Sequence, residues 1–377
     1  MGNARGAVSE LFSLFLRLGF TAFGGPAAHI SMMHDEVVTR RQWMTDQHFL
    51  DLVGATNLIP GPNSTEMAIH IGYERAGWRG LLVAGLCFIL PAVLIVLVLA
   101  WAYVEYGSTP QGDALLYGIK PVIIAIVVQA LVRLAPKALK SPTLWVVGAG
   151  ALVLYLLGFN ELAILFGGAF LVVAIEAARR YQGMMAVLLL IPAQVDESTP
   201  VTLWRIFLVF LKVGALLYGS GYVLLAFLRT DLVVHYGWLT DQQLLDAVAV
   251  GQFTPGPVFT TATFVGYLLA GVPGAAVATI GIFLPSFIFV AILARLMPHI
   301  RKSVWTASFL DGVNVTALAL MAGVTLQLAQ AAIVDVATAL LTVGAAVVLL
   351  RFKINSAWLV LAGGLIGLSI YFVQGRL

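Results

Sequence analysis

The chain has 377 residues, of which 60% are hydrophobic and only 10% are charged, whereas a soluble globular protein carries about 25% charged residues. This composition excludes a soluble enzyme, because too few polar side chains are present to cover the domains that a chain of this length would form. The net charge of +3 is spread without a polybasic block, so nucleic acid is not an expected partner. We therefore predict an all-α protein that crosses the lipid bilayer several times.

Apolar segments follow one another along the chain, six in each half. They lie near residues 11–30, 47–73, 79–104, 114–133, 143–158, 161–178, 204–228, 242–268, 273–296, 306–331, 333–350 and 356–373. Most reach or approach the ~20 residues that span a bilayer as a helix. Prolines and acidic residues interrupt the pattern after the sixth segment. We therefore divide the chain into a first membrane repeat at 1–180, a connector at 181–203 and a second membrane repeat at 204–377.

The two halves are copies of each other at an offset of 195 residues. The sequence Trp-Met-Thr-Asp-Gln at 43–47 recurs as Trp-Leu-Thr-Asp-Gln at 238–242, and the Pro-Gly-Pro at 60–62 recurs at 255–257. After one deletion the offset becomes 194, which relates Pro91 to Pro285. Repeats with Gly/Pro interruptions at matching positions indicate a transporter whose site lies where the repeats meet.

Loop charges predict how the halves are oriented. Lys and Arg gather in 31–46 and in 74–79, and loops of this kind face the cytoplasm. The element between them then enters and leaves on one side, as a re-entrant hairpin broken at Pro-Gly-Pro. The expected fold is an all-α polytopic membrane protein with two homologous repeats in inverted topology, about ten transmembrane helices and two re-entrant helical hairpins. The alternative is twelve plain spans with parallel halves.

Four breaks in the apolar elements are the candidate substrate site. A half-helix that begins after a break directs free N–H groups and the positive end of its dipole at the break, which favours an anion, and hydroxyl and amide groups add donors. The candidate residues at the breaks are Gly24, Gly25, Pro26, Pro60, Gly61, Pro62, Asn63, Ser64, Thr65, Gly219, Ser220, Gly221, Pro255, Gly256, Pro257, Thr260 and Thr261. The alternative is that Gly and Pro only allow kinks or close helix packing.

Two cations lie at equivalent positions within apolar helices. Arg17 and Lys212 are related by the repeat, and a cation deep in a membrane helix costs about 2.5–3.5 kcal/mol on insertion scales. An anion bound between them would offset that cost, so we include both in the candidate substrate site. The alternative is that each side chain snorkels to the headgroups. Lys120 is a third candidate cation, with an interfacial position expected.

An acid and a histidine follow the first Pro-Gly-Pro. Glu66 and His70 are four residues apart and share one helix face, whereas their repeat counterparts are Thr261 and Val265. Because the repeat does not account for an intramembrane carboxylate, we interpret the pair as a proton-coupling site or a gate. The alternative is that Glu66 lies at a helix end and pairs with Arg75 or Arg79.

Other polar residues are expected to have structural roles. Thr240 to Gln243 reads as a capping box, with Asp241 in the first helical turn; Asp246 is expected at an interface. His29, His34 and His48 surround a polar loop without a metal-binding motif, so we expect them to be solvated and predict no metal site. The single cysteine, Cys87, excludes an intramolecular disulfide. Because Arg17 interrupts the first apolar segment, we expect no cleaved signal peptide.

Two motifs resemble those of a known family. Phe-Thr-Ala-Phe-Gly-Gly-Pro at 20–26 and Leu-Ile-Pro-Gly-Pro-Asn-Ser-Thr-Glu at 58–66, with the second Pro-Gly-Pro at 255–257, resemble the chromate ion transporter family in its long-chain, two-domain form. The resemblance extends from about residue 11 to 374. It implies a multi-pass protein of the cytoplasmic (inner) membrane that exports chromate, with sulfate as a close chemical analogue. The second copy departs from both motifs, with Gly-Ser-Gly at 219–221 in place of Gly-Gly-Pro and Val-Phe at 258–259 in place of Asn-Ser. We therefore expect the two half-sites to contribute unequally.

These observations together predict a transporter that exports a tetrahedral oxyanion by alternating access. The resemblance implies that the oxyanion is chromate and that export confers chromate resistance. A transporter for sulfate or another anion, or an anion channel, is the alternative. An intramembrane enzyme using Glu66 and His70 is disfavoured, because no nucleophile or metal set accompanies them. We expect no catalytic residues and no cofactor. A homodimer is one of the oligomeric states that the sequence allows.

Overall fold

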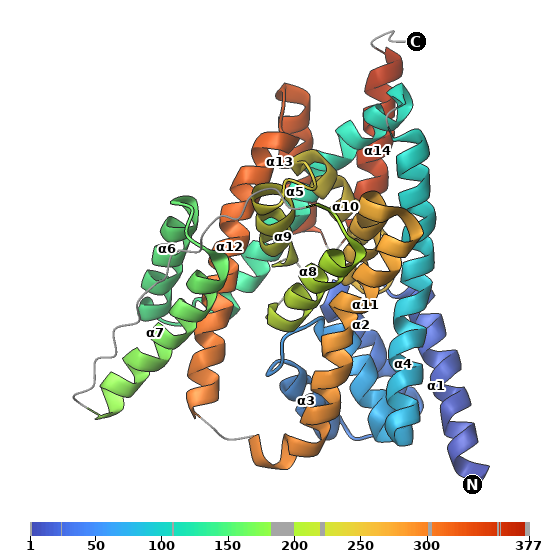
Figure 1. Ribbon diagram of the computed structural model, residues 1–377, viewed down its shortest axis with the longest axis vertical. Coiled ribbons are helices and arrows are strands. Elements are labelled where there is room, and N and C mark those ends of the chain that lie inside the picture. Colours follow the sequence, from blue (N-terminus) through green and yellow to red (C-terminus); the bar gives the residue numbers. More distant parts are fainter. Residues whose placement is uncertain are drawn as a thin grey trace.

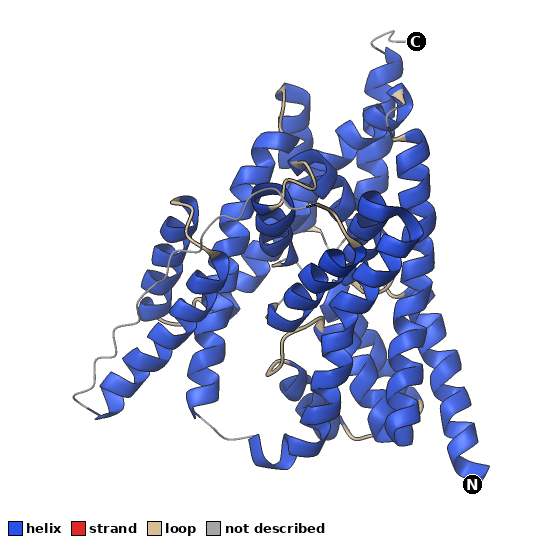
Figure 2. Cartoon of the chain, viewed as in Figure 1, coloured by secondary structure: helices blue, strands red, loops and turns tan. Residues whose placement is uncertain are grey.

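A computed structural model describes residues 2–23, 25–107, 109–181, 200–218, 223–300, 304–352, 354 and 356–373. All regular elements in these ranges are helices (Figure 2). Of the predicted site residues, Gly24, Gly219, Ser220 and Gly221 lie outside the described residues, as does most of the predicted connector at 181–203.

The helices follow the predicted apolar segments in order. In the first half they are α1 (Gly2–Thr21), α2 (Gly25–His34), the π-helical η1 (Asp35–Arg40), α3 (Asp46–Thr56), α4 (Asn63–Tyr106), α5 (Pro110–Ala138), α6 (Pro142–Leu156) and α7 (Glu161–Tyr181). In the second half they are α8 (Leu203–Leu216), α9 (Leu224–Leu228), the π-helical η2 (Arg229–His235), α10 (Asp241–Phe253), the 3-10 turn η3 (Val258–Thr260), α11 (Thr261–Ile300), α12 (Val304–Ala332), α13 (Val336–Arg351) and α14 (Ser356–Val373).

Six stretches of the described helices are long and apolar enough to cross a membrane. They are Asn63–Tyr106, Pro110–Ala138, Glu161–Ala178, Val258–Ala294, Ala307–Ala332 and Ser356–Val373. The helices α6 and α13 are apolar but shorter. The chain is therefore built as a multi-pass membrane protein, while the count of ten spans stays a prediction.

The helices end at the predicted breaks. The first residue of α2, Gly25, has a φ of 78°, and between α3 and α4 the chain passes through Gly61 with a φ of 136°. These left-handed backbone angles favour glycine, which has no Cβ to clash. In the second half, α10 ends at Phe253 just before the Pro-Gly-Pro, where Gly256 has a φ of 92°.

The long helix after each Pro-Gly-Pro bends sharply partway along its length. Non-helical backbone angles occur at Ala76 and Gly77 in α4, and at the equivalent Ala270 and Gly271 in α11. A Cβ built on Gly72 would collide with the carbonyl group of Gly80, so the segments on either side of the kink pack directly against each other. The predicted boundary between the segments 47–73 and 79–104 falls at this kink.

The two halves pack through their long helices. Extensive contacts join α1 to α4, α8 to α11 and α4 to α11, while α5 packs against α12, α13 and α14. Figure 1 places α6 and α7 at the side of the molecule away from α1, where they pack on α12. Gly19 on α1 lies against the carbonyl oxygens of Cys87 and Phe88, a close approach that small residues allow in membrane helices.

The predicted caps form at the starts of α3 and α10. The Thr240 hydroxyl accepts a hydrogen bond from the backbone N–H of Gln243, and the Gln243 side chain accepts one from the backbone N–H of Thr240. The capping box is therefore confirmed. At the equivalent start of α3, Thr45 accepts from the backbone N–H of His48 at 3.3 Å.

Candidate functional site

The two Pro-Gly-Pro segments each bond to the other half of the chain. The N–H of Gly61 donates to the carbonyl of Leu217, and the N–H of Gly256 donates to the carbonyl of Ala22, both at 2.8 Å. Gly61 and Gly256 are repeat equivalents, as are Ala22 and Leu217, so the two bonds are copies of one interaction, as in an interface with two-fold symmetry. Each Pro-Gly-Pro therefore lies against the break in the first element of the other half, and we call this region the crossing.

The start of α4 brings polar groups to the crossing. Asn63 is its first residue, and the preceding Pro62 offers no side-chain cap. The N–H groups of Thr65 and Glu66 donate to the Pro62 carbonyl, so the N–H groups without a partner within the helix are those of Asn63 and Ser64. Ser64 and Thr65 are buried, and the Thr65 hydroxyl has no hydrogen-bond partner among the described residues. Asn63 instead donates its side-chain amide to Asn57, at 2.6 Å.

Glu66 is fully buried one turn into α4. Ser286 on α11 donates a long hydrogen bond of 3.4 Å to Glu66 Oε1, and Oε2 has no partner among the described residues. A Cβ on Gly61 would collide with Glu66 Oε1 and lie 2.8 Å from Ser286 Oγ. Gly61 therefore lets the carboxylate lie against the Pro-Gly-Pro backbone. The alternative pairing with Arg75 does not form, because Arg75 binds Glu10 at 2.8 Å.

Two buried histidines near this region also lack partners. Neither ring nitrogen of His70 or His29 has a hydrogen-bond partner in the described part of the chain, and both side chains are buried. Each unsatisfied buried polar group costs about 1–3 kcal/mol and calls for an explanation such as water, an ion or a proton. The expectation that His29 is solvated is wrong, because it lies on α2, where its ring packs edge-on against Phe88 at 5.6 Å.

The equivalent positions of the second half are less polar. The hydroxyls of Thr260 and Thr261 donate to the carbonyls of Pro257 and Val258, both at 2.8 Å. A Cβ on Gly256 would lie 2.9 Å from the Cβ of Ala92, and Ala92 is the repeat equivalent of Ser286. The carboxylate and hydroxyl that face the first Pro-Gly-Pro therefore have no counterparts at the second.

The predicted cations are both held in ion pairs. Arg17 Nη2 lies 2.8 Å from Glu36 Oε1, and Lys212 Nζ lies 2.6 Å from Asp231 Oδ1. Glu36 and Asp231 are themselves repeat equivalents, which is the sequence signal that could have identified them. Burial raises the pKa of Glu36, but hydrogen bonds from Arg17 and Arg41 and nearby positive charge outweigh burial, so its pKa lies below the ordinary glutamate value.

A third ion pair joins the two halves beside a cavity. Lys120 Nζ on α5 lies 3.3 Å from Asp246 Oδ1 on α10, and Tyr103 donates to Asp246 Oδ2 at 2.8 Å. Asp246 is 2% exposed, so its carboxylate is buried within the protein. The pair lines a cavity of about 560 Å³ together with Asp113 and Trp238. Sequence reasoning missed this contact because α5 and α10 are far apart along the chain.

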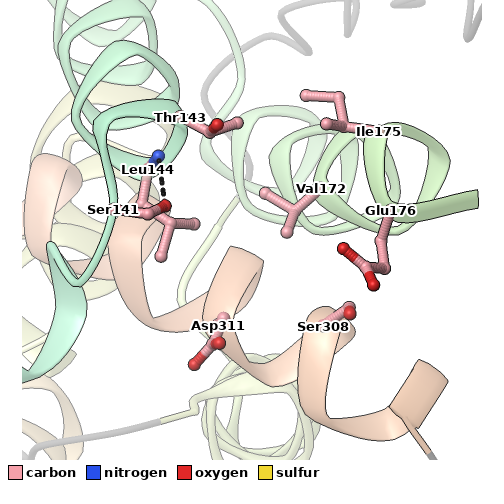
Figure 3. Close-up of a pocket in the computed structure, with 8 residues that line it drawn as sticks. All are labelled: Ser141, Thr143, Leu144, Val172, Ile175, Glu176, Ser308 and Asp311. Atoms are coloured by element: carbon pink, nitrogen blue, oxygen red, sulfur yellow. Dashed lines mark hydrogen bonds between the residues drawn. The ribbon is translucent and has the colours of Figure 1, made fainter. Parts of the chain in front are cut away.

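A smaller cavity lies away from the crossing. It has a volume of about 110 Å³ and is lined by hydroxyl and acidic residues of α6, α7 and α12, including Ser141, Ser308 and Glu176 (Figure 3). Asp311 at its edge pairs with Lys140 at 2.6 Å. No residue predicted from the sequence as part of the site lies here.

Comparison with known proteins identifies the family. The family model for chromate transporters matches the chain twice, at residues 9–173 and 204–368. The chain is 36% identical over 372 residues to the chromate transport protein of Cupriavidus metallidurans, covering 96% of this chain and 93% of that one. It is 33% identical over 394 residues to the chromate transport protein of Pseudomonas aeruginosa, covering 97% and 93%.

A third relative agrees with these two. The chain is 33% identical over 345 residues to a probable chromate transport protein of Synechococcus elongatus, covering 89% of this chain and 88% of that one. No solved structure matches the chain. With two matches to one family and relatives aligned over most of their length, the chain belongs to the chromate transporter family.

Proposed function

We propose that this protein exports chromate across the cytoplasmic membrane by alternating access and so confers chromate resistance. The observation that carries the proposal is the reciprocal pair of hydrogen bonds from Gly61 and Gly256, which brings Gly/Pro breaks of both halves together. Broken helices within a membrane are tolerated where protein or a water-lined cavity surrounds them, and transporters use such breaks to bind substrate. The named relatives are chromate transport proteins.

The proposed topology has inverted repeats, about ten spans and two re-entrant hairpins, α3 with the first part of α4 and α10 with the first part of α11. Support comes from the Lys/Arg-rich loops at 31–46 and 74–79 and from the kinks at Gly77 and Gly271. In Figure 1, α4 and α11 lie together and run in opposite directions. A crossing between inverted halves can open to either side of the membrane by movement of one half against the other.

At the crossing, chromate would bind to the start of α4. The donors would be the first backbone N–H groups of α4, with Ser64 and Thr65, since a helix N-terminus favours anions. Thr260 and Thr261 would donate from the second half after their hydroxyls release the carbonyls of Pro257 and Val258. Arg17 and Lys212 would also bind the anion. To do so, Arg17 would leave its ion pair with Glu36, and Lys212 would leave its ion pair with Asp231.

Glu66 is the proposed proton-coupling group or gate. Its carboxylate lies against Gly61 and Ser286, which is where an oxyanion at the crossing would be expected. A bound anion and an ionised Glu66 repel each other at this distance. Movement or protonation of Glu66 would therefore accompany substrate binding, with His70 on the same helix face as a second proton site.

Sulfate is the second candidate substrate, because it shares the charge and tetrahedral shape of chromate. Counterflow with purified protein in liposomes tests carrier function for both. Liposomes preloaded with unlabelled chromate should take up labelled sulfate transiently above equilibrium. Equilibration without this overshoot would indicate an anion channel, and no flux of either anion would contradict the proposed function.

A further inference from the structure

The two equivalent ion pairs beside the crossing differ in charge. In the second half, Lys212 and Asp231 form a pair of one cation and one anion. In the first half, Arg17 shares Glu36 with two more guanidinium groups: Arg40 Nη1 lies 2.8 Å from Glu36 Oε1, and Arg41 Nε lies 3.3 Å from Oε2. We call Arg17, Arg40 and Arg41 the arginine cluster.

The arginine cluster carries more positive charge than one carboxylate can balance. Three guanidinium groups surround Glu36, so two of their positive charges are not balanced by its carboxylate. In the second half, the positions equivalent to Arg40 and Arg41 are His235 and Tyr236. The side chains of Arg17 and Arg40 are 51% and 68% exposed, whereas that of Glu36 is only 9% exposed. Each guanidinium has five N–H donors, so the exposed sides of the cluster can still bind an anion.

Two further acids on the same loop, Asp35 and Asp46, contact His34 and not the guanidinium groups. Asp35, the neighbour of Glu36, lies 3.9 Å from His34, and Asp46 lies 2.7 Å from the same ring. Arg41 also stacks over Trp43 at 5.2 Å. The acids are thus gathered at His34, while the guanidinium groups are gathered at Glu36.

The cluster lies close to the crossing. Arg17 precedes Ala22 by five residues, or about 7–8 Å along a helix at 1.5 Å per residue, and Ala22 accepts the hydrogen bond from Gly256. Planar guanidinium forks match the oxygen pairs of tetrahedral oxyanions. We propose that Arg17, Arg40 and Arg41 form a loading site that binds a tetrahedral oxyanion dianion before it enters the crossing, with Arg17 shared between the loading site and the crossing, an inference that rests on the proposed export function.

The equivalent end of the second half has the opposite charge. There, Trp238, the repeat equivalent of Trp43, lines the 560 Å³ cavity, where the charged side chains are Asp113, Asp246 and the single cation Lys120. Exposed guanidinium groups concentrate anions locally at the arginine cluster, and the excess of negative charge lowers their concentration at the cavity. In an inverted transporter these ends face opposite sides of the membrane, so the charges favour loading at the arginine cluster and release at the cavity.

The test is transport kinetics of Arg40→Gln/Arg41→Gln, which keeps the pair of Arg17 with Glu36. Chromate is presented to proteoliposomes on the side of the 31–46 loop, at equal protein abundance. The KM should rise about tenfold, equivalent to about 1.4 kcal/mol, while kcat stays nearly unchanged. The dependence of kcat/KM on salt should also weaken, because exposed charges are screened by salt.

The matched control is Arg133→Gln/Lys137→Gln, which removes two exposed charges from the end of α5 on the same proposed membrane side. It should leave the KM within about twofold, and Arg40→Lys/Arg41→Lys should retain part of the wild-type affinity. An unchanged KM in Arg40→Gln/Arg41→Gln, or an equal rise in the control, would overturn the loading site while leaving export intact. Absence of chromate or sulfate transport by the wild type would instead overturn the proposed function and the loading site together.

Discussion

Single side chains distinguish the two halves of this transporter at the crossing. Glu66 and Ser286 face each other beside the first Pro-Gly-Pro, whereas their repeat equivalents are Thr261 and Ala92. Packing alone does not require a fully buried carboxylate with one oxygen unpaired among the described residues, because such a group costs free energy. We therefore propose that Glu66 serves function rather than stability.

Glu66→Gln should change the pH dependence of transport more than its maximal rate. The amide keeps the shape of the side chain and can still accept a hydrogen bond from Ser286, but it cannot exchange a proton. At fixed membrane potential, we expect the transport rate to depend less on pH than in the wild type. The maximal rate should stay within about twofold of wild type, which corresponds to a change of less than about 0.5 kcal/mol in the activation free energy. Initial rates of chromate transport at several pH values measure this. Glu105→Gln, an exposed acid at the other end of α4, is the control, and an unaltered profile in Glu66→Gln would contradict the assignment.

Lys212→Ala should destabilise the folded protein, because Asp231 loses its partner. The pair is partly buried, so we expect a loss of about 2 kcal/mol, between the ~1 of exposed pairs and the ~3–5 of buried ones. Lys212→Ala/Asp231→Asn should regain much of this loss in thermal stability in detergent. If the double variant regains stability but not transport, Lys212 contacts the substrate; if both return, its role is pairing.

At the scale of elements, the crossing depends on glycine. Gly61 combines a φ of 136° with a position against Glu66 and Ser286, so a side chain there is strained and has no space. Backbone strain of this kind costs about 1–3 kcal/mol. The same two features explain why α3 and α4 remain separate helices with a break between them.

Gly61→Ala should therefore reduce transport strongly and lower the Tm. Gly54→Ala is a matched control on α3, since a Cβ there meets no atom within 4 Å, and alanine is the better helix former by about 1 kcal/mol. Transport per folded protein and thermal unfolding of both variants measure the effect. Near-normal transport in Gly61→Ala would mean that the crossing is not the substrate site.

The ends of helices were predictable from the sequence where a few neighbouring residues determine the local backbone structure. Proline geometry set the breaks at both Pro-Gly-Pro motifs, and the Thr-x-x-Gln pattern set the cap at Thr240. The burial of His29 was not predicted, because its loop turned out to be helical. The Lys120–Asp246 pair depends on the packing of α5 against α10, and no local pattern reports such a distant contact.

At the scale of the whole molecule, the proposed topology places the 31–46 and 74–79 loops on one membrane side. Cysteines introduced as Thr39→Cys and Trp78→Cys, both exposed, should react with an impermeant reagent from the cytoplasm in a Cys87→Ala background. Gln111→Cys, in the first turn of α5 and in a region poor in positive charge, should react from the opposite side. Opposite labelling of positions 39 and 78 would contradict the re-entrant hairpin and the inverted topology.

The energetics favour export of a dianion without another driving ion. Moving two negative charges out of a negative-inside cell gains about 4.6 kcal/mol per 100 mV, from ~2.3 kcal/mol for each charge. At ~1.4 kcal/mol per factor of ten, this supports a concentration ratio of roughly a thousand or more. Uptake against the same field would need cotransported cations, and Glu66 is the main candidate in the crossing to bind them.

The most direct test of chromate export is transport into inside-out proteoliposomes under an imposed potassium diffusion potential, without a pH gradient. The account predicts that a lumen-positive potential accelerates chromate accumulation and that a lumen-negative potential slows it. If chromate accumulation did not change with the membrane potential and occurred only with a pH gradient, potential-driven export would be contradicted. Proton coupling would then be obligatory.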